Sequence, residues 1–235
     1  MGLPLFIAEA DDRELVIASD NAGAIGPKPD DAVQVPYEVV AQALFRVAIM
    51  DTLAVGASPF AVNLMNFAGE EAWNELEKTI ISQCRRLGIE MGITGSTESN
   101  FSMNQSAVGL TVIGKVMKAD KKIGCSPQGC GLALIGEPLV GEEVIQCADR
   151  AAPLELFAEM TQQEWVYELV PVGSKGIDGS LREWERRNGR EQRKWEVPFD
   201  CSKSGGPSTS FLVSYDLNCD LDLIKMAEAF VTVIR

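Results

Sequence analysis

The chain has 235 residues, of which 46% are hydrophobic and 23% are charged, a composition that is ordinary for a soluble globular protein of one large domain or two small ones. Its 34 acidic and 21 basic residues give a net charge of -13, which argues against nucleic acid or an anionic membrane as a partner. The chain has no histidine, which excludes Ser-His-Asp and Cys-His catalysis and the usual zinc sites.

The sequence contains no apolar run of the ~18–20 residues needed to span a bilayer, and its first residues lack the pattern of a signal peptide. We therefore expect a cytoplasmic protein. The six cysteines include no CxxC spacing. Cys125 and Cys130 bracket a turn-like segment and could close a small loop if oxidised, but free thiols are the expected state in a cytosolic chain.

The first chemically suggestive stretch is Ile17–Asp31. The apolar run Leu15–Ala18 predicts a buried strand that ends in an irregular, glycine- and proline-rich loop. The loop offers exposed backbone, the cation Lys28, and carboxylates suited to Mg2+. These carboxylates are Asp20, Asp30 and Asp31. Neither a Walker A motif nor GxGxxG is present, and an exposed charged turn is the alternative interpretation.

A helix is predicted next, over Tyr37–Ala57, and its apolar residues cover almost its whole circumference. Such a helix is buried on several sides. Arg46 and Asp51 interrupt the apolar surface, so each is either a salt-bridge partner or a site residue.

The rest of the first half alternates strands and one amphipathic helix. Strands are predicted at Phe60–Asn66, Ile89–Thr94 and Ala107–Lys115, with a helix at Gly69–Gly88. The charges of this helix form a solvated face, and we assign it no chemistry. A second polar cluster, Gly95–Asn100, follows the strand at Ile89–Thr94. The polar segment Met117–Gln128 is the predicted domain boundary.

The second half begins a new cycle of strands and helices. Strands are predicted at Gly131–Gly136, Val166–Val172, Ser208–Tyr215 and Val231–Ile234, and helices at Gly141–Arg150, Pro153–Gln163, Leu181–Gly189 and Leu221–Phe230. Lys175 and Lys203 each lie in a Gly/Ser-rich loop that is either a phosphate or ribose site or an ordinary turn. The irregular order of elements favours an α+β fold over a Rossmann fold.

Several of these stretches together resemble the aminoimidazole-ribonucleotide-synthetase-like (PurM-like) superfamily. They are Asp20 with its glycine-containing loop, Asp51–Pro59, Ile93–Glu98 in place of a Gly-Gly-Asp-Thr loop, and Val108–Val116. The resemblance implies a two-domain α+β fold with mixed sheets packed against helices. Residues 1–117 would form an ATP- and Mg-binding domain whose strands build a homodimer interface, and residues 118–235 a shortened α/β domain.

Within the superfamily, the loops around Asp20, Gly95, Lys175 and Lys203 look most like those of α-ribazole kinases, which serve cobalamin lower-ligand salvage. The resemblance therefore implies an ATP- and Mg2+-dependent kinase acting on a small nucleoside-like alcohol. There are two alternatives. One is an ATP-dependent synthetase that activates an amide or carboxyl oxygen, and the other is a non-catalytic nucleotide-binding module. The family's glycine-rich N-terminal segment is missing or reduced to the residues before Leu15, and its loop acid is displaced to Glu98.

These considerations predict a site. The metal ligands would be Asp20, Asp51 and Glu98, because three converging carboxylates would repel one another strongly without a cation. Arg46 could instead neutralise one of them. The catalytic residues would be Asp20, Lys28 and Asp31, with Asp30 as the alternative base. The nucleotide would contact Asn21, Gly23, Gly26, Gly95, Ser96, Thr97, Asn100, Lys175, Lys203, Gly205 and Gly206.

Overall fold

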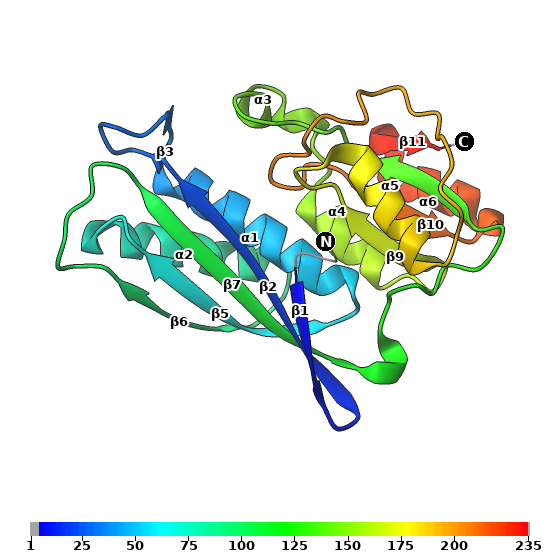
Figure 1. Cartoon of the computed structure of the whole chain (residues 1–235), viewed down its shortest axis with the longest axis horizontal. Coiled ribbons are helices and arrows are strands. Elements are labelled where there is room, and N and C mark those ends of the chain that lie inside the picture. The colour runs from blue at the N-terminus through cyan, green and yellow to red at the C-terminus, as the bar shows by residue number, and fades with distance from the viewer. Residues whose placement is uncertain (1–4, 235) are drawn as a thin grey trace. The chain divides into compact units, whose positions relative to one another are not determined.

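The computed structural model describes residues 5–234, which form two compact units. The first unit holds the described residues up to Thr52 together with Ala57–Ala119. The second unit holds Leu53–Gly56 and the residues from Asp120 onward. Each unit contains one main sheet with helices packed against it (Figure 1).

The first unit is built on a five-stranded sheet in the order β1-β2-β7-β5-β6. Its strands are β1 (Leu5–Ala10), β2 (Arg13–Gly23), β5 (Ser58–Asn66), β6 (Gly92–Thr97) and β7 (Ala107–Met117). All neighbours are antiparallel except β5 and β6, which are parallel. The helices α1 (Tyr37–Ala54) and α2 (Glu70–Arg86) cover one face of this sheet, and the short strands β3 (Ile25–Gly26) and β4 (Val33–Gln34) pair within the loop after β2 (Figure 1).

Strand alternation explains which face the helices cover. Val16 and Ala18 of β2 are fully buried, whereas Leu15 and Ser19, which point to the other side of the strand, are exposed. The apolar surface of α1 is also buried, with Phe45 and Ile49 inaccessible to solvent. Among the described residues of this unit, no helix lies on the opposite face of the sheet, and we call it the open face.

Three predicted boundaries in the first unit are wrong. The strand predicted at Leu15–Ala18 continues to Gly23, because β2 pairs with β7 over its whole length, Asp20 opposite Leu110 and Gly23 opposite Ala107. The cluster expected to be a loop from Gly95 onward is part of β6 up to Thr97, because it pairs with β5. The predicted helix at Tyr37–Ala57 ends earlier, at Ala54.

The second unit contains a four-stranded antiparallel sheet in the order β11-β8-β10-β9. Its strands are β8 (Gly131–Ile135), β9 (Val166–Pro171), β10 (Phe211–Tyr215) and β11 (Val231–Val233). Its α-helices are α3 (Glu143–Gln146), α4 (Leu154–Thr161), α5 (Gly176–Arg187) and α6 (Asp220–Ala227). Single 3-10 turns lie at η1 (Lys118–Asp120), η2 (Ala148–Arg150), η3 (Leu217–Cys219) and η4 (Glu228–Phe230).

Helices pack on both faces of this second sheet (Figure 1). On one face, Trp184 of α5 joins a buried cluster with Leu134 and Leu212 from two strands. On the other, the ring of Phe157 in α4 meets Phe211 edge-on at 4.8 Å. Helix α5 begins at Gly176, so residues 176–179, which were expected to lie in a loop, form its first turn.

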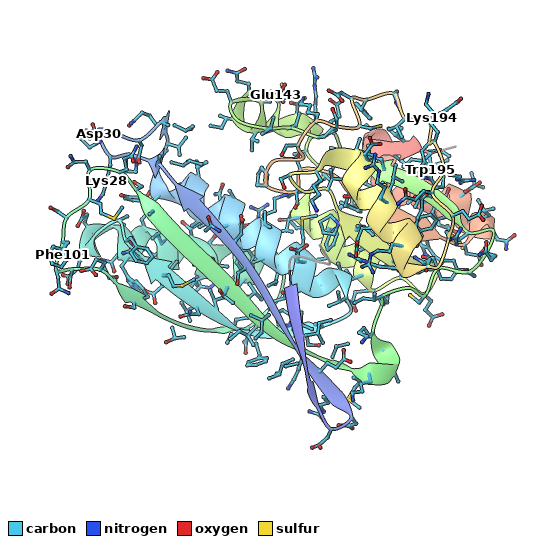
Figure 2. All side chains as sticks on the ribbon, in the orientation of Figure 1. Lys28, Asp30, Phe101, Glu143, Lys194 and Trp195 are labelled. Carbon is cyan, nitrogen blue, oxygen red and sulfur yellow. The ribbon has the colours of Figure 1, made fainter. Side chains whose placement is uncertain are left out.

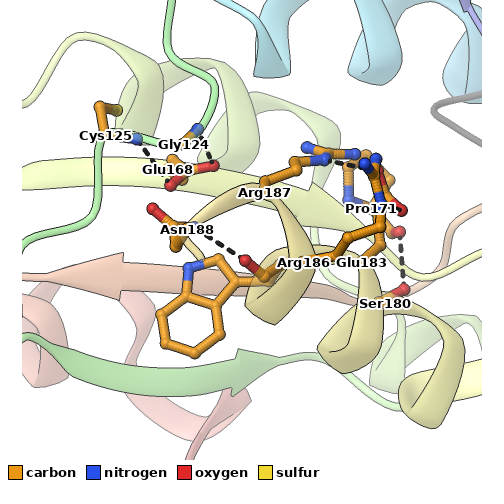
Figure 3. A network of polar contacts seen from close by, with 10 residues as sticks. Gly124, Cys125, Glu168, Pro171, Ser180, Glu183, Arg186, Arg187 and Asn188 are labelled. Carbon is orange, nitrogen blue, oxygen red and sulfur yellow. Dashed lines mark hydrogen bonds and ion pairs between the residues drawn. The ribbon is translucent and has the colours of Figure 1, made fainter. Parts of the chain in front are cut away.

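A buried carboxylate holds the segment that leads into the second unit (Figure 3). Glu168 of β9 is 1% exposed and accepts hydrogen bonds from the backbone N–H groups of Gly124, Cys125 and Ser126 at 3.0–3.1 Å. It also accepts one from the Ser126 hydroxyl at 2.6 Å. The indole N–H of Trp184 donates to the same hydroxyl oxygen at 3.0 Å. These bonds satisfy a charge that would otherwise be costly to bury.

Two further observations concern the helices and the cysteines. Among residues 5–234, no helix combines the length and the apolar character needed to cross a membrane. All six cysteines, Cys125 and Cys130 included, are free thiols.

Candidate functional site

Four strands of the first unit meet at the same end of their sheet. Strands β2, β5 and β6 end there and β7 begins there, because Gly23 lies opposite Ala107, and Asn66 lies opposite both Val108 and Thr97. The loops that follow β2, β5 and β6 therefore lie close together. Figure 2 shows Lys28, Asp30 and Phe101, from two of these loops, at this end of the unit.

Hydrogen bonds join the loop after β2 to the loop between β6 and β7. The Lys28 ammonium donates to the Met103 carbonyl oxygen at 2.7 Å. The Gln105 side-chain amide donates to the Asp30 carbonyl oxygen at 2.7 Å. The structure thus brings together two of the loops that the sequence singled out.

Asp31 has a structural place in this arrangement. Its buried carboxylate accepts hydrogen bonds from the backbone N–H of Lys28 at 2.9 Å and from the backbone N–H and hydroxyl of Ser106, both at 2.7 Å. Burial acts to raise the pKa of Asp31, but these hydrogen bonds and the Lys28 charge outweigh it and lower the pKa below its ordinary value of 3.8. A carboxylate occupied in this way is a poor general base, so we correct its predicted role.

The loops enclose a pocket of about 380 Å³, which we call the strand-end pocket. It is lined by Lys28, residues 67–71, residues 98–99 and residues 101–103. Its charged groups are the carboxylates of Glu70, Glu71 and Glu98 and the Lys28 ammonium. Phe67, Phe101 and Met103 on its wall are 46%, 78% and 40% exposed.

Sequence reasoning found only part of this pocket. Lys28 and Glu98 were candidates, but Phe67 and Phe101 were missed, and α2, which contributes Glu70 and Glu71, was assigned no chemistry. Two apolar residues, Phe101 and Met103, inside the otherwise polar stretch from Ser99 to Ser106 were the signal that could have found the pocket.

The predicted metal site is not assembled. Among the residues that the structure describes, no group of three Cys, Asp or Glu side chains is placed to hold a metal ion, so Asp20, Asp51 and Glu98 do not form the expected triad. Asp20 lies within β2 on the helix-covered face, and Asp51 is buried in α1. One carboxylate oxygen of Glu98 instead accepts from the backbone N–H groups of Asn100 and Phe101, at 2.7 and 3.3 Å.

The environment of Asp20 differs from that of the other carboxylates. Burial raises its pKa above the ordinary value of 3.8, and a hydrogen bond from the backbone of Asn21 opposes the rise. Asn21 itself is exposed on the open face, as is Ser96 on β6. The Thr97 hydroxyl accepts a hydrogen bond from buried Asn66 at 3.2 Å.

Most of the predicted nucleotide-binding glycines serve packing. A Cβ on Gly26 would overlap Ser106, and one on Gly95 would overlap the Leu64 carbonyl oxygen. In the second unit, a Cβ on Gly205 would overlap the Val172 carbonyl oxygen, and one on Gly206 would overlap that of Leu139. Gly23 is different, because no atom lies within 4 Å of where its Cβ would be. The side of this residue on which a side chain would lie is therefore unobstructed.

The two lysine-containing loops of the second unit contact each other. The N–H of Gly205 donates to the Gly173 carbonyl oxygen at 3.0 Å. The Lys203 ammonium forms an ion pair with Glu143 at 2.7 Å, so its charge is partly neutralised. Lys175 is exposed at the N-terminus of α5. The two loops form a polar surface within this unit.

No family profile matches the chain, and no curated protein matches it significantly. Its two sheet-and-helix units nevertheless define a PurM-like mixed fold, which confirms the predicted fold class. The crystal structure of thiamine-monophosphate kinase from Stenotrophomonas maltophilia K279a has this fold, with a TM-score of 0.63, 13% identity, and coverage of 99% of this chain and 87% of that one.

Two further structures share the fold. AaThiL, complexed with AMPPCP and TMP, matches with a TM-score of 0.63 and 12% identity over 100% of this chain and 84% of that one. PurL of T. maritima, complexed with ADP, matches with a TM-score of 0.65 and 16% identity over 100% of this chain and 42% of that one. Similarity at these identities establishes the fold. The narrower resemblance to α-ribazole kinases stays a prediction.

Proposed function

We propose that this protein is an ATP-dependent kinase that phosphorylates a hydroxyl group of a small nucleoside-like alcohol, with α-ribazole as the first acceptor to test. The observation that carries the proposal is the likeness in fold, over 99% of this chain, to a thiamine-monophosphate kinase. A further structure of the same fold was crystallised with the ATP analogue AMPPCP. The strand-end pocket supplies a site of adequate size for a small molecule.

The chemistry is transfer of the γ-phosphoryl group of ATP. The acceptor oxygen forms a bond to the γ-phosphorus, the bond to the bridging oxygen breaks, and ADP leaves with that electron pair. The acceptor proton passes to a base, and we propose the exposed carboxylate of Asp30 for this role, since that of Asp31 is occupied by Ser106. In the first unit, the unobstructed side of Gly23 would let a phosphate approach the chain, whereas the Lys28 ammonium donates to the Met103 carbonyl oxygen.

Magnesium would neutralise the charge of ATP when bound. The described carboxylates do not form a ready three-ligand site, so we assign no step to the metal. This absence of a carboxylate cluster is also the observation that favours one alternative, a nucleotide-binding module without catalysis. The likeness to T. maritima PurL crystallised with ADP favours the other, an ATP-dependent synthetase.

One incubation separates the three functions. Purified protein is mixed with ATP, Mg2+ and a panel of alcohols that includes α-ribazole, and the products are followed by phosphorus NMR and mass spectrometry. A stable phosphomonoester formed together with ADP is the expected result. Phosphate release coupled to a new C–N bond would support the synthetase instead. Nucleotide binding without any phosphorylated acceptor would overturn the kinase and leave the module.

A further inference from the structure

We infer that the strand-end pocket binds the heteroaromatic ring of the acceptor, as a neutral or cationic ring, and does not hold the triphosphate of ATP. This inference rests on the proposed function and names the part of the substrate that this pocket recognises. It follows from the side chains of the wall, from their charge and from how their hydrogen bonds are used.

The wall exposes flat apolar surface to solvent. Phe101 is 78% exposed and Phe67 is 46% exposed, and both line the pocket together with Met103. Figure 2 shows Phe101 extending from its loop at the same end of the unit as Lys28. Stacking or edge contact with an aromatic ligand would remove this surface from water. A phosphate chain offers no such contact.

The charge of the lining opposes phosphate. The lining contains three acidic residues, Glu70, Glu71 and Glu98, and one basic residue, Lys28. The ammonium already donates to the Met103 carbonyl oxygen at 2.7 Å. In a protein of net charge -13, such a lining repels anions and attracts cationic or electron-poor rings.

Helix α2 does not reverse this field, although its N-terminus borders the pocket. Glu70 and Glu71 lie in its first turn, and the Glu71 carboxylate lies so close to Gly69 that it would clash with a Cβ there. The partial positive charge of the helix end is thus already balanced by the helix's own side chains. Glu98 accepts hydrogen bonds from the N–H groups of Asn100 and Phe101, and so holds the loop that presents Phe101.

The test uses three benzimidazole probes that differ in charge. They are 1-methylbenzimidazole, 1,3-dimethylbenzimidazolium and benzimidazole-5-carboxylate, titrated into the full chain by calorimetry and by NMR, in parallel with ATP. We expect the neutral and cationic probes to bind at least about 10-fold more tightly than the carboxylate, as expected when a like charge is placed near an acidic lining.

Variants assign the binding to the pocket. Phe101→Ala is expected to weaken the binding of the neutral probe about 3- to 10-fold, because one ring contact is lost. Phe60→Ala is the control, because Phe60 is also exposed to solvent, at 42%, but does not line the pocket. This substitution should leave probe binding unchanged. Glu70→Gln should reduce the preference for the cationic over the carboxylate probe about 3-fold while preserving the Tm.

The inference is overturned if the carboxylate probe binds as tightly as the other two. It is also overturned if Phe101→Ala weakens the binding of ATP and leaves the affinities for the probes unchanged. Phosphorylation of α-ribazole is measured separately for each variant. If the protein phosphorylates α-ribazole but Phe101→Ala does not change the affinities for the probes, only the assignment of the pocket is wrong. If the probes bind in a charge-dependent way that Phe101→Ala abolishes, but no acceptor is phosphorylated, only the kinase proposal is wrong.

Discussion

The carboxylate of Asp31 accepts hydrogen bonds from both the backbone N–H and the hydroxyl of Ser106, each at 2.7 Å, although the two residues are 75 positions apart. The pair closes the loop after β2 onto the residue that precedes β7. We expect Asp31→Ala to lower the free energy of unfolding by about 2–3 kcal/mol, because buried donors lose a charged acceptor. Urea denaturation measures the loss, with the exposed neighbour Asp30→Ala as the control, which should change stability by less than about 0.5 kcal/mol.

The same pair predicts that the stability of the protein depends on pH. The pKa of Asp31 is lowered on folding, so its stabilisation is complete above the ordinary value of 3.8 and is lost as the pH falls through the lower folded value. The stability difference between the protein and its Asp31→Asn variant should therefore shrink only on acidification below about pH 4. A difference that stays constant from about pH 5 to about pH 2 would contradict the assignment.

Asp20 should behave in the opposite sense. Its pKa is raised by burial, so the protonated form favours folding at low pH and this contribution is lost as the pH rises through the raised value. At neutral pH the charged carboxylate opposes folding, and Asp20→Asn should increase the free energy of unfolding, by less than about 1 kcal/mol. Thermal unfolding at neutral and acidic pH checks this. A lower Tm for the variant at neutral pH would show that the charged form is stabilising.

Asp51 is 4% exposed in α1, and the described carboxylates do not gather around it. We expect Asp51→Asn to cost about 1–3 kcal/mol of stability, because the substitution removes the charge of a side chain buried in the helix, and to leave ATP turnover per folded molecule nearly unchanged. Arg46→Met on the same helix is the comparison. If Asp51→Asn instead melts normally and loses at least ~100-fold in Mg2+-dependent turnover, Asp51 belongs to a metal site after all.

Gly95 and Gly92 provide a matched pair on β6. A Cβ on Gly95 would overlap the Leu64 carbonyl oxygen and approach the Trp73 ring, whereas the nearest atom to a Cβ on Gly92 is 4.0 Å away. Gly95→Ala should therefore cost about 1–3 kcal/mol by overpacking, and Gly92→Ala almost nothing. Chemical denaturation measures both. Equal stabilities, with nucleotide affinity lost only in Gly95→Ala, would return Gly95 to a ligand-binding role.

The open face of the first sheet predicts self-association. Leu15, Met65 and Met117 are 36–37% exposed there, and the resemblance implies a homodimer built from these strands. We expect light scattering at micromolar concentration to give the mass of two chains. Met65→Glu should yield the mass of one chain, because it places a charge in the interface. Leu221→Glu, on α6 of the second unit and 69% exposed in the wild type, should not. A single-chain mass for the unaltered protein would refute the dimer.

Local pattern predicts much of the secondary structure. The helix predicted at Gly69–Gly88 is found at Glu70–Arg86, and the strand predicted at Phe60–Asn66 is found at Ser58–Asn66. In both, hydrophobic spacing and flanking glycine or proline act over a few residues. The absence of histidine and the excess of acids also restrict the chemistry, because both are properties of composition and do not depend on how the chain folds.

The amino-acid sequence therefore specifies most helices and strands and the fold class, whereas contacts between distant segments decide which polar groups meet. Strand β2 extends to Gly23 only because β7 lies beside it, and Asp31 is unavailable as a base only because Ser106 arrives from a distant loop. Phe101 is part of a pocket because the Glu98 turn and α2 lie next to it. Such contacts depend on strand register and loop closure between residues far apart, and no local periodicity encodes them.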